Sequence, residues 1–321
     1  MLKKSFYCFG FAFLLICLFI SFSTVALANY PEKDIKVIVH VSPGGGTDTM
    51  IRLVTKYMGE KLGVNFIVED HSGAGGQIGY TALSMAEPDG YTIGSITTMS
   101  IVTMELTREG VAFTFKDDFE PIARLVLDPS VCVVPVNSPF QTMKDMIQAA
   151  KENPGKINWG GTMLYGTHHI QAVLLEKEAG VKFSYIPYDG FSELLPSILG
   201  EQIDSAASGM TEWLPQIKEG KLRALAFAGP SRTEWLPGVP TYKELGYKVA
   251  VGSNRGLAAP AGTPKEYIEI LSNTVQEVLQ DPEFLKDAEK IGIVPILGYL
   301  NGEDFKDYLW TLQDNMKEIL K

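Results

Sequence analysis

Short apolar runs alternate with helical periodicity along the chain from residue 35 onward. Residues 35–41 are rich in β-branched side chains, and the Ser-Pro-Gly-Gly-Gly stretch at residues 42–46 interrupts this run. Thr47 and Asp48 are residue types favoured at helix starts, and the apolar positions after them recur at helical spacing until Gly63. This segment therefore predicts a strand, a glycine-rich loop and a helix.

The same unit recurs along the chain. Beyond Pro264 the pattern is helical, with breaks near Asp281-Pro282 and Pro295. Strands that alternate with helices form mainly parallel sheets flanked by helices, so the fold class is α/β. We predict further strands at residues 66–68, 91–95, 131–136, 157–159, 184–186, 203–207 and 222–227, helices at 78–86, 142–152, 167–179 and 192–199, and polar loops at 70–76, 97–100, 160–166 and 188–191.

The chain length of 321 residues suits two lobes. We expect residues 29–129 plus 250–321 to form lobe 1 and residues 130–249 to form lobe 2. The C-terminal helices then return to lobe 1, because lobe 2 already has its strands and helices. Hinge segments are expected near residues 127–130 and 250–253.

The N-terminus has the pattern of a secretory signal peptide at residues 1–28. Lys3 and Lys4 precede an apolar stretch at residues 6–22, and Ala26-Leu27-Ala28 supplies a small-residue cleavage site. Cleavage after Ala28 predicts an extracytoplasmic, periplasmic protein. An uncleaved anchor helix is the alternative, at the lower limit of membrane-spanning length.

Composition narrows the function classes. Hydrophobic residues make up 45% and charged residues 21% of the chain, which excludes a disordered chain, a coiled coil and a polytopic membrane protein. The net charge is −10, and no basic cluster follows the leader, so we expect no nucleic-acid partner. Cys132 is the single cysteine after the leader, which leaves no internal disulfide and no thiolate metal site.

Catalytic and cofactor motifs are absent from the sequence. There is no G-x-S-x-G, H-E-x-x-H, Walker A or C-x-x-C pattern. The glycines at residues 73–79 have G-x-G-x-x-x-G spacing, which does not match a dinucleotide-binding fingerprint. His168 and His169 are adjacent at a helix start, so both cannot face one metal. These observations disfavour an enzyme, a cofactor-binding protein and a metal site.

The loops after the predicted strands carry the functional information, because ligands of open parallel sheets bind at the carboxyl ends of strands. These loops are rich in Gly, Ser and Thr, and none contains Lys or Arg. Each leads into a predicted helix start, where free N–H groups and the positive dipole end can hold a carboxylate. Tight strand-to-helix turns need the same residues, so a purely structural role is the alternative for each loop. Asp48 and Asp189 are either helix caps or acceptors for a ligand hydrogen bond.

The ordered set of loop motifs resembles the substrate-binding receptors of tripartite tricarboxylate transporters, also called Bug proteins. The resemblance spans nearly the whole mature chain. It rests on Pro43-Gly44-Gly45-Gly46-Thr47-Asp48, Gly73-Ala74-Gly75-Gly76-Gln77-Ile78-Gly79, Pro88-Asp89-Gly90-Tyr91-Thr92, Gly160-Gly161-Thr162 with Gly166-Thr167-His168, Pro187-Tyr188-Asp189-Gly190, and Ala259-Pro260-Ala261-Gly262-Thr263-Pro264.

This resemblance implies a two-lobed, type II-like periplasmic-binding-protein (Venus flytrap) fold. It also implies a monomeric receptor, not an enzyme, that closes on a small organic anion and delivers it to one large and one small integral membrane subunit. In the family, main-chain groups and ordered waters hold a ligand carboxylate. The ligand-binding residues carried over to this chain are Gly44, Gly45, Thr47, Asp48, Gly75, Gly76, Thr97 and Thr98 in lobe 1, and Thr162, Thr167, His168, Asp189 and Gly190 in lobe 2.

Some positions depart from the family pattern. Met163, Leu164 and Tyr165 stand where many members have smaller residues, and the segment Ser253-Asn254-Arg255-Gly256 lacks the aromatic residue often found before that glycine. Arg255 is therefore either a cation in the cleft or part of an ion pair. A solute sensor that feeds a signalling partner remains an alternative function, as does a secreted hydrolase or lyase.

Overall fold

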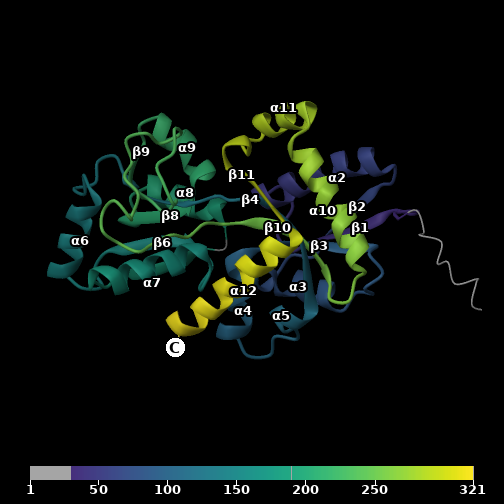
Figure 1. The fold of residues 1–321 in the computed structure, drawn as a ribbon. Coiled ribbons are helices and arrows are strands. Elements are labelled where there is room, and N and C mark those ends of the chain that lie inside the picture. Colours follow the sequence, from purple (N-terminus) through teal and green to yellow (C-terminus); the bar gives the residue numbers. More distant parts are fainter. Residues whose placement is uncertain (1–29, 189, 321) are drawn as a thin grey trace, which may run out of the picture.

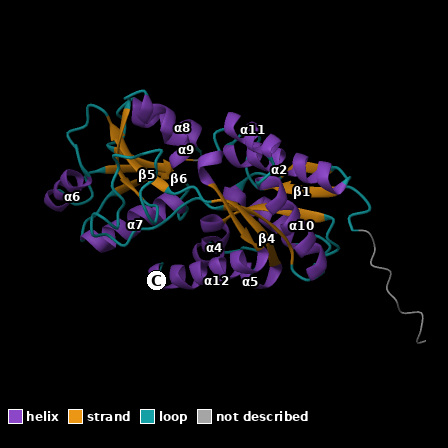
Figure 2. Cartoon of the chain, turned by 45° about the horizontal axis from the view of Figure 1, so that its top comes forward, coloured by secondary structure: helices purple, strands orange, loops and turns teal. Residues whose placement is uncertain are grey.

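The computed structural model describes residues 30–188 and 190–320, so the predicted signal peptide lies outside the described residues. Two β-sheets, each with its own helices, form two lobes that lie side by side (Figure 1). Figure 2 shows the strands of both lobes enclosed by helices. The prediction of a two-lobed α/β fold is confirmed.

The first sheet has the order β11-β4-β10-β3-β1-β2. β1 is parallel to β2 and β3, whereas β10 runs antiparallel between β3 and β4, and β11 is antiparallel to β4. The sheet is thus mixed rather than mainly parallel as expected, because β10 enters from a distant part of the chain and runs antiparallel to both of its neighbours. The bounds are β1 (Ile35–Val39), β2 (Phe66–Asp70), β3 (Thr92–Thr97), β4 (Phe119–Val126), β10 (Arg255–Pro260) and β11 (Leu297–Asn301).

The second sheet repeats this arrangement with the order β7-β6-β8-β5-β9. β6 is parallel to β7 and β8, and β5 runs antiparallel between β8 and β9. Each sheet therefore receives one antiparallel strand directly after a crossing from the other lobe. The bounds are β5 (Ser130–Pro135), β6 (Asn158–Thr162), β7 (Ser184–Tyr188), β8 (Ser205–Gly209) and β9 (Leu222–Phe227).

The helices bury apolar faces against these sheets. In α2, Met50, Val54 and Met58 are fully buried, and Gly63 ends the helix in a left-handed conformation. α10 packs on α2 and β4, and α12 packs on β4 and α4 (Figure 1). The helices are α2 (Gly46–Leu62), α3 (Gln77–Ser84), α4 (Thr98–Thr107), α5 (Phe115–Asp118), α6 (Met143–Glu152), α7 (Thr167–Ala179), α8 (Phe191–Leu199), α9 (Met210–Lys218), α10 (Lys265–Leu279), α11 (Pro282–Lys290) and α12 (Gly302–Ile319), with short 3₁₀ turns η1 (Ala74–Gly76) and η2 (Val294–Ile296).

Two segments connect the lobes and pair with each other. Pro129 forms an isolated antiparallel bridge with Gly252. The Ser130 N–H donates to the Val251 carbonyl at 3.1 Å, and the Ser253 N–H donates to the Asp128 carbonyl at 2.8 Å. The chain thus crosses twice through one short two-stranded connection.

One predicted loop is wrong. Residues 97–100 were expected to be a polar loop, but Thr98 starts helix α4. Every residue from Thr98 to Met104 is buried, and burial of this helix between its neighbours outweighs the weak helix propensity of Thr and Ser.

Candidate ligand-binding site

The carboxyl ends of the parallel strands lie at the edge of each sheet where the chain crosses between the lobes. In the first sheet, Thr97 at the end of β3 pairs with Arg255 at the start of β10, three residues after the bridging Gly252. In the second sheet, Gly209 at the end of β8 pairs with Ser130, the first residue of β5. The strand ends of the two lobes therefore face each other across the crossing segments.

Six helices begin at these strand ends: α2, α3 and α4 in lobe 1, and α7, α8 and α9 in lobe 2. Within the described chain, no side chain caps the first turn of any of them. In contrast, Thr142, Asp281 and Asn301 cap α6, α11 and α12, which begin elsewhere. α5 and α10 also lack a side-chain cap, so the site is defined by the convergence of these six helix starts. The first amides of α4 and α9 already donate to backbone carbonyls, Thr98 to Asn254 at 3.0 Å and Met210 to Pro129 at 3.1 Å. The other helix starts bring first-turn amides and positive dipole ends from both lobes to the same sheet edges.

Asp48 holds the β1–α2 loop in shape. Its side chain is buried, and its Oδ2 accepts a hydrogen bond from the Gly44 N–H at 2.8 Å. Its Oδ1 accepts from Arg52 Nε at 2.7 Å, and Arg52 also pairs with Asp70 at 2.9 Å. Both carboxylate oxygens are therefore engaged, and Asp48 positions the exposed residues Gly44 and Gly45.

We expect Asp48→Ala to lower the free energy of unfolding by about 1–3 kcal/mol, because the Gly44 N–H and Arg52 would lose a buried acceptor. Glu60→Ala is a matched control on the same helix. Glu60 is exposed and pairs with Lys56 only at 3.9 Å, so its loss should cost less than about 0.5 kcal/mol. Urea unfolding measures both variants. Equal stability of the two would contradict the role given to Asp48.

The β2–α3 loop is a tight left-handed turn. Gly75 and Gly76 have φ angles of 64° and 97°, and a Cβ at Gly76 would lie 3.0 Å from His40 Cδ2. Ser100 Oγ donates to the Gly75 carbonyl at 3.1 Å, and Arg108 Nη1 donates to the Ala74 carbonyl at 2.5 Å. Glycine is thus required here for backbone conformation and close packing.

Thr97 and Thr98 lie at the start of α4, beside His40. His40 Nδ1 is 2.7 Å from Ser95 Oγ, and its Nε2 is 3.1 Å from Thr97 Oγ1. Burial lowers the pKa of His40 to about 4, so this ring is neutral and structural. Thr98 Oγ1 is buried without a hydrogen-bond partner among the described residues, whereas the Thr98 N–H donates to the Asn254 carbonyl.

In lobe 2, Thr162 orients His168 at the start of α7. Thr162 Oγ1 lies 2.7 Å from His168 Nδ1. Burial, with a smaller effect of the charged Arg255, lowers the pKa of His168 to about 3. His168 is 4% exposed, and its Nε2 has no partner in the part of the chain that the structure describes. A neutral imidazole with one unused nitrogen therefore lies at the strand-end edge of lobe 2.

The remaining predicted ligand-binding residues of lobe 2 are Thr167, Asp189 and Gly190. Thr167 is buried as the first residue of α7, and Gly190 is the extended residue before α8. Asp189 lies outside the described residues.

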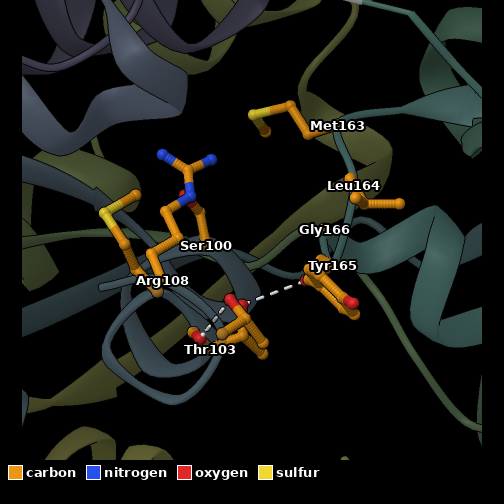
Figure 3. Close-up of a pocket in the computed structure, with 9 residues that line it drawn as sticks. Ser100, Thr103, Arg108, Met163, Leu164, Tyr165 and Gly166 are labelled. Carbon is orange, nitrogen blue, oxygen red and sulfur yellow. Dashed lines mark hydrogen bonds between the residues drawn. The ribbon is translucent and has the colours of Figure 1, made fainter.

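The two lobes touch through α4 and the β6–α7 loop (Figure 3). Thr103 Oγ1 donates to the Tyr165 carbonyl at 3.0 Å. A small interlobe pocket there has room for at most about one water molecule. It is lined by Ser100, Thr103, Met104, Thr107, Arg108, Met163, Leu164, Tyr165 and Gly166. Met163 and Tyr165 have positive φ angles, 57° and 61°. The large residues that depart from the family pattern thus lie where the lobes meet.

Arg255, expected to be either a cation in the cleft or part of an ion pair, lies near Asp128 and near the start of α2. The strand-end loops carry no Lys or Arg, but Arg255 reaches this edge from β10. Its Nη1 lies 4.0 Å from the position that a Cβ of Gly46 would occupy, and its Nη2 lies 3.8 Å from Asp128 Oδ2. Burial raises the pKa of Asp128 to about 6, against an opposing effect of Arg255. The loop composition could not reveal Arg255, because it is distant in sequence from every glycine-rich loop.

Residues 30–188 and 190–320 contain no group of three or more His, Cys, Asp or Glu side chains placed to hold a metal ion. Across the same residues, no helix has the length and apolar character needed to cross a bilayer.

Comparison with known proteins relates the chain to one family over most of its length. Residues 50–318 match the family described as "Tripartite tricarboxylate transporter family receptor". A Cupriavidus necator protein, "UPF0065 protein in gbd 5'region", is 32% identical over 91% of this chain and 88% of its own length.

Solved structures share the fold. The periplasmic binding protein BugD is 30% identical, with a TM-score of 0.77 over 90% of this chain and 97% of its own. The R. palustris protein Rpa4515, solved with adipate, is 24% identical, with a TM-score of 0.79 over 90% of this chain and 97% of its own. The expected periplasmic-binding-protein fold is confirmed.

Proposed function

The chain belongs to the tripartite tricarboxylate transporter receptor family, and we propose that it captures a small organic carboxylate between its lobes and delivers it to the membrane subunits of such a transporter. Members of this family are solute-binding receptors, so we assign binding and release of an unchanged ligand rather than a reaction. The adipate bound by Rpa4515 is consistent with a carboxylate ligand here.

The observation that carries this proposal is the convergence of uncapped helix starts from both lobes. Free amides at a helix N-terminus bind anions through hydrogen bonds and through the positive end of the helix dipole. Because the surface charge is negative overall, affinity for an anion must come from such local groups. We propose that the ligand contacts include Gly44, Gly45, Thr47 and the Gly75-Gly76 turn in lobe 1, and Thr162, Thr167, His168 and Gly190 in lobe 2.

We further propose that the lobes move apart to admit the ligand. The interlobe pocket has little free volume, and Thr103 already bonds to Tyr165 across it. A ligand that contacts both lobes favours the closed form, because only that form offers every contact. Two crossing segments, near residues 127–130 and 250–253, are the proposed hinge. The lobes on either side are residues 29–129 plus 250–321, and residues 130–249.

Residues 1–28 are proposed to export the protein to the periplasm. This location fits the family, whose member BugD is a periplasmic binding protein. The membrane partners are proposed to be one large and one small integral subunit.

A thermal-shift screen tests the carboxylate proposal. We expect at least one of malate, adipate, citrate, glutamate and benzoate to raise the melting temperature, because a ligand that binds only the folded state stabilises it. A ligand at 100 times its Kd adds about 2.7 kcal/mol. The amide of each acid is the matched control and should give little shift. Equal shifts from acids and amides, or stabilisation by no acid, would contradict the proposal.

A further inference from the structure

Arg255 lies at the centre of the strand-end region. It is the first residue of β10, and its register partners Thr97 and Val126 are near the ends of β3 and β4. Arg255 is 8% exposed, and its side chain is 10% exposed, so the guanidinium is largely enclosed and retains a small exposed fraction.

The hydrogen-bonding capacity of this guanidinium is unused among the described residues. An arginine has five N–H donors. Asp128 is the one acidic group that pairs with it in the described chain, at 3.8 Å, which is beyond hydrogen-bond distance. On its other side, Nη1 faces the uncapped first turn of α2 at Gly46. An acceptor in that space would meet both the guanidinium and the helix start.

His168 supplies a second unused polar group from the opposite lobe. His168 lies in the first turn of helix α7 at the strand-end edge of lobe 2, whereas His40 lies beside Thr97 at the end of β3 in lobe 1. Both ring nitrogens of His40 have partners, whereas Nε2 of the 96% buried His168 has none in the described chain. If Thr162 donates to Nδ1, the neutral ring presents Nε2–H as a donor.

We propose that Arg255 is the specificity-determining side chain of the site, binding a ligand carboxylate through charge-assisted hydrogen bonds while His168 Nε2–H donates to the ligand from lobe 2. This inference rests on the proposed function and adds to it. Main-chain amides accept either an acid or its amide at a carbonyl oxygen, but a guanidinium favours the charged acid. Arg255 therefore determines the preference for the acid over its amide, and Asp128 orients the guanidinium while it competes with the ligand.

Titration calorimetry with every acid that stabilises the wild-type protein, and with its amide, tests this role. We expect Arg255→Gln to weaken acid binding roughly 10- to 100-fold, the range for a hydrogen bond to a charged group, and to change amide binding little. Arg255→Lys should restore part of the affinity, because it keeps the charge and loses the planar donor geometry. Asp128→Asn should bind acids at least as tightly as the wild-type protein, because it removes the competing anion.

Two further variants separate binding from folding. Arg255→Gln alone leaves Asp128 as a buried carboxylate without its counter-charge. The Asp128→Asn/Arg255→Gln double variant removes both charges and should fold, yet it should still bind acids as weakly as Arg255→Gln. Arg223→Gln is the matched control. Arg223 lies near the start of β9, at the end of the lobe 2 sheet away from the crossing segments, and donates to the Val136 carbonyl. It should bind like the wild-type protein.

The outcomes distinguish this inference from the function on which it rests. If no acid binds the wild-type protein, the proposed function fails and this inference fails with it. If acids bind the wild-type protein and the double variant retains both the affinity and the preference for acid over amide, Arg255 has only a structural role and the proposed function stands.

Discussion

Gly46→Pro is expected to weaken carboxylate binding roughly 10- to 100-fold without unfolding the protein, because it removes one N–H donor from the first turn of α2. Gly46 is the first residue of α2, a position where proline is well tolerated. Gly45 before it has φ −73° and ψ 166°, the extended conformation that a following proline requires. A Cβ at Gly46 would meet no atom closer than Arg255 Nη1, at 4.0 Å.

Gly46→Val is the matched control for this variant. Valine adds three side-chain carbons, as proline does, but keeps the N–H group. If the amide binds the ligand, the valine variant should bind much more tightly than the proline variant. Calorimetry with a stabilising acid measures both, and circular dichroism checks that both fold. Equal affinity of the two variants would show that the Gly46 amide does not contribute.

Stability is expected to fall as the pH drops from 6.5 to 5, because two buried histidines resist protonation. Burial lowers the pKa of His40 to about 4 and that of His168 to about 3, whereas both titrate near 6.5 in the unfolded chain. The unfolded chain therefore binds more protons in this range, and the histidine contribution is complete only above 6.5. Asp128 acts in the opposite direction, because burial raises its pKa to about 6 and the folded state takes up its proton first.

For these three groups together, the unfolded chain binds roughly one more proton than the folded chain, a loss of roughly 1 kcal/mol per pH unit, and burial of His169, which lowers its pKa, acts in the same direction. Urea unfolding at several pH values measures this slope. His168→Gln should make it shallower, and Asp128→Asn should make it steeper. Stability that stays constant or rises toward pH 5 would mean that these rings are not held neutral in the fold.

Local signals were sufficient for the elements bounded by strong turn residues. The predicted helix at residues 167–179 and the predicted strand at 222–227 coincide with α7 and β9. Gly166 and Gly180 flank the helix, and Gly220 precedes the strand, so these glycines mark the boundaries of both elements in the sequence.

Tertiary burial decided the elements that were missed. β10 reads Arg-Gly-Leu-Ala-Ala-Pro, without a β-branched residue, yet all six positions are buried between β3 and β4. Gly256 in this strand is required by packing, because a Cβ there would lie 2.5 Å from the Ala123 carbonyl oxygen. Propensity cannot reveal a strand that exists because distant segments enclose it.

The candidate site was predictable only in part for the same reason. Glycine-rich loops after strands indicated where backbone amides would be free, and the six uncapped helix starts follow those loops. The position of Arg255 beside Thr97 at the end of β3 depends on the register of β10 against β3, which no local sequence pattern encodes. Asp48 was expected to be either a helix cap or an acceptor for a ligand hydrogen bond, and in the structure its two oxygens accept hydrogen bonds from Gly44 and Arg52 within lobe 1.

A crystal structure of the protein with an acid that raises its melting temperature tests the central claim most directly. The account predicts one ligand carboxylate about 3 Å from first-turn amide nitrogens of α2, with groups from lobe 2 contacting the same molecule. A ligand bound outside the region between the lobes, or held without any helix-start amide, would contradict it.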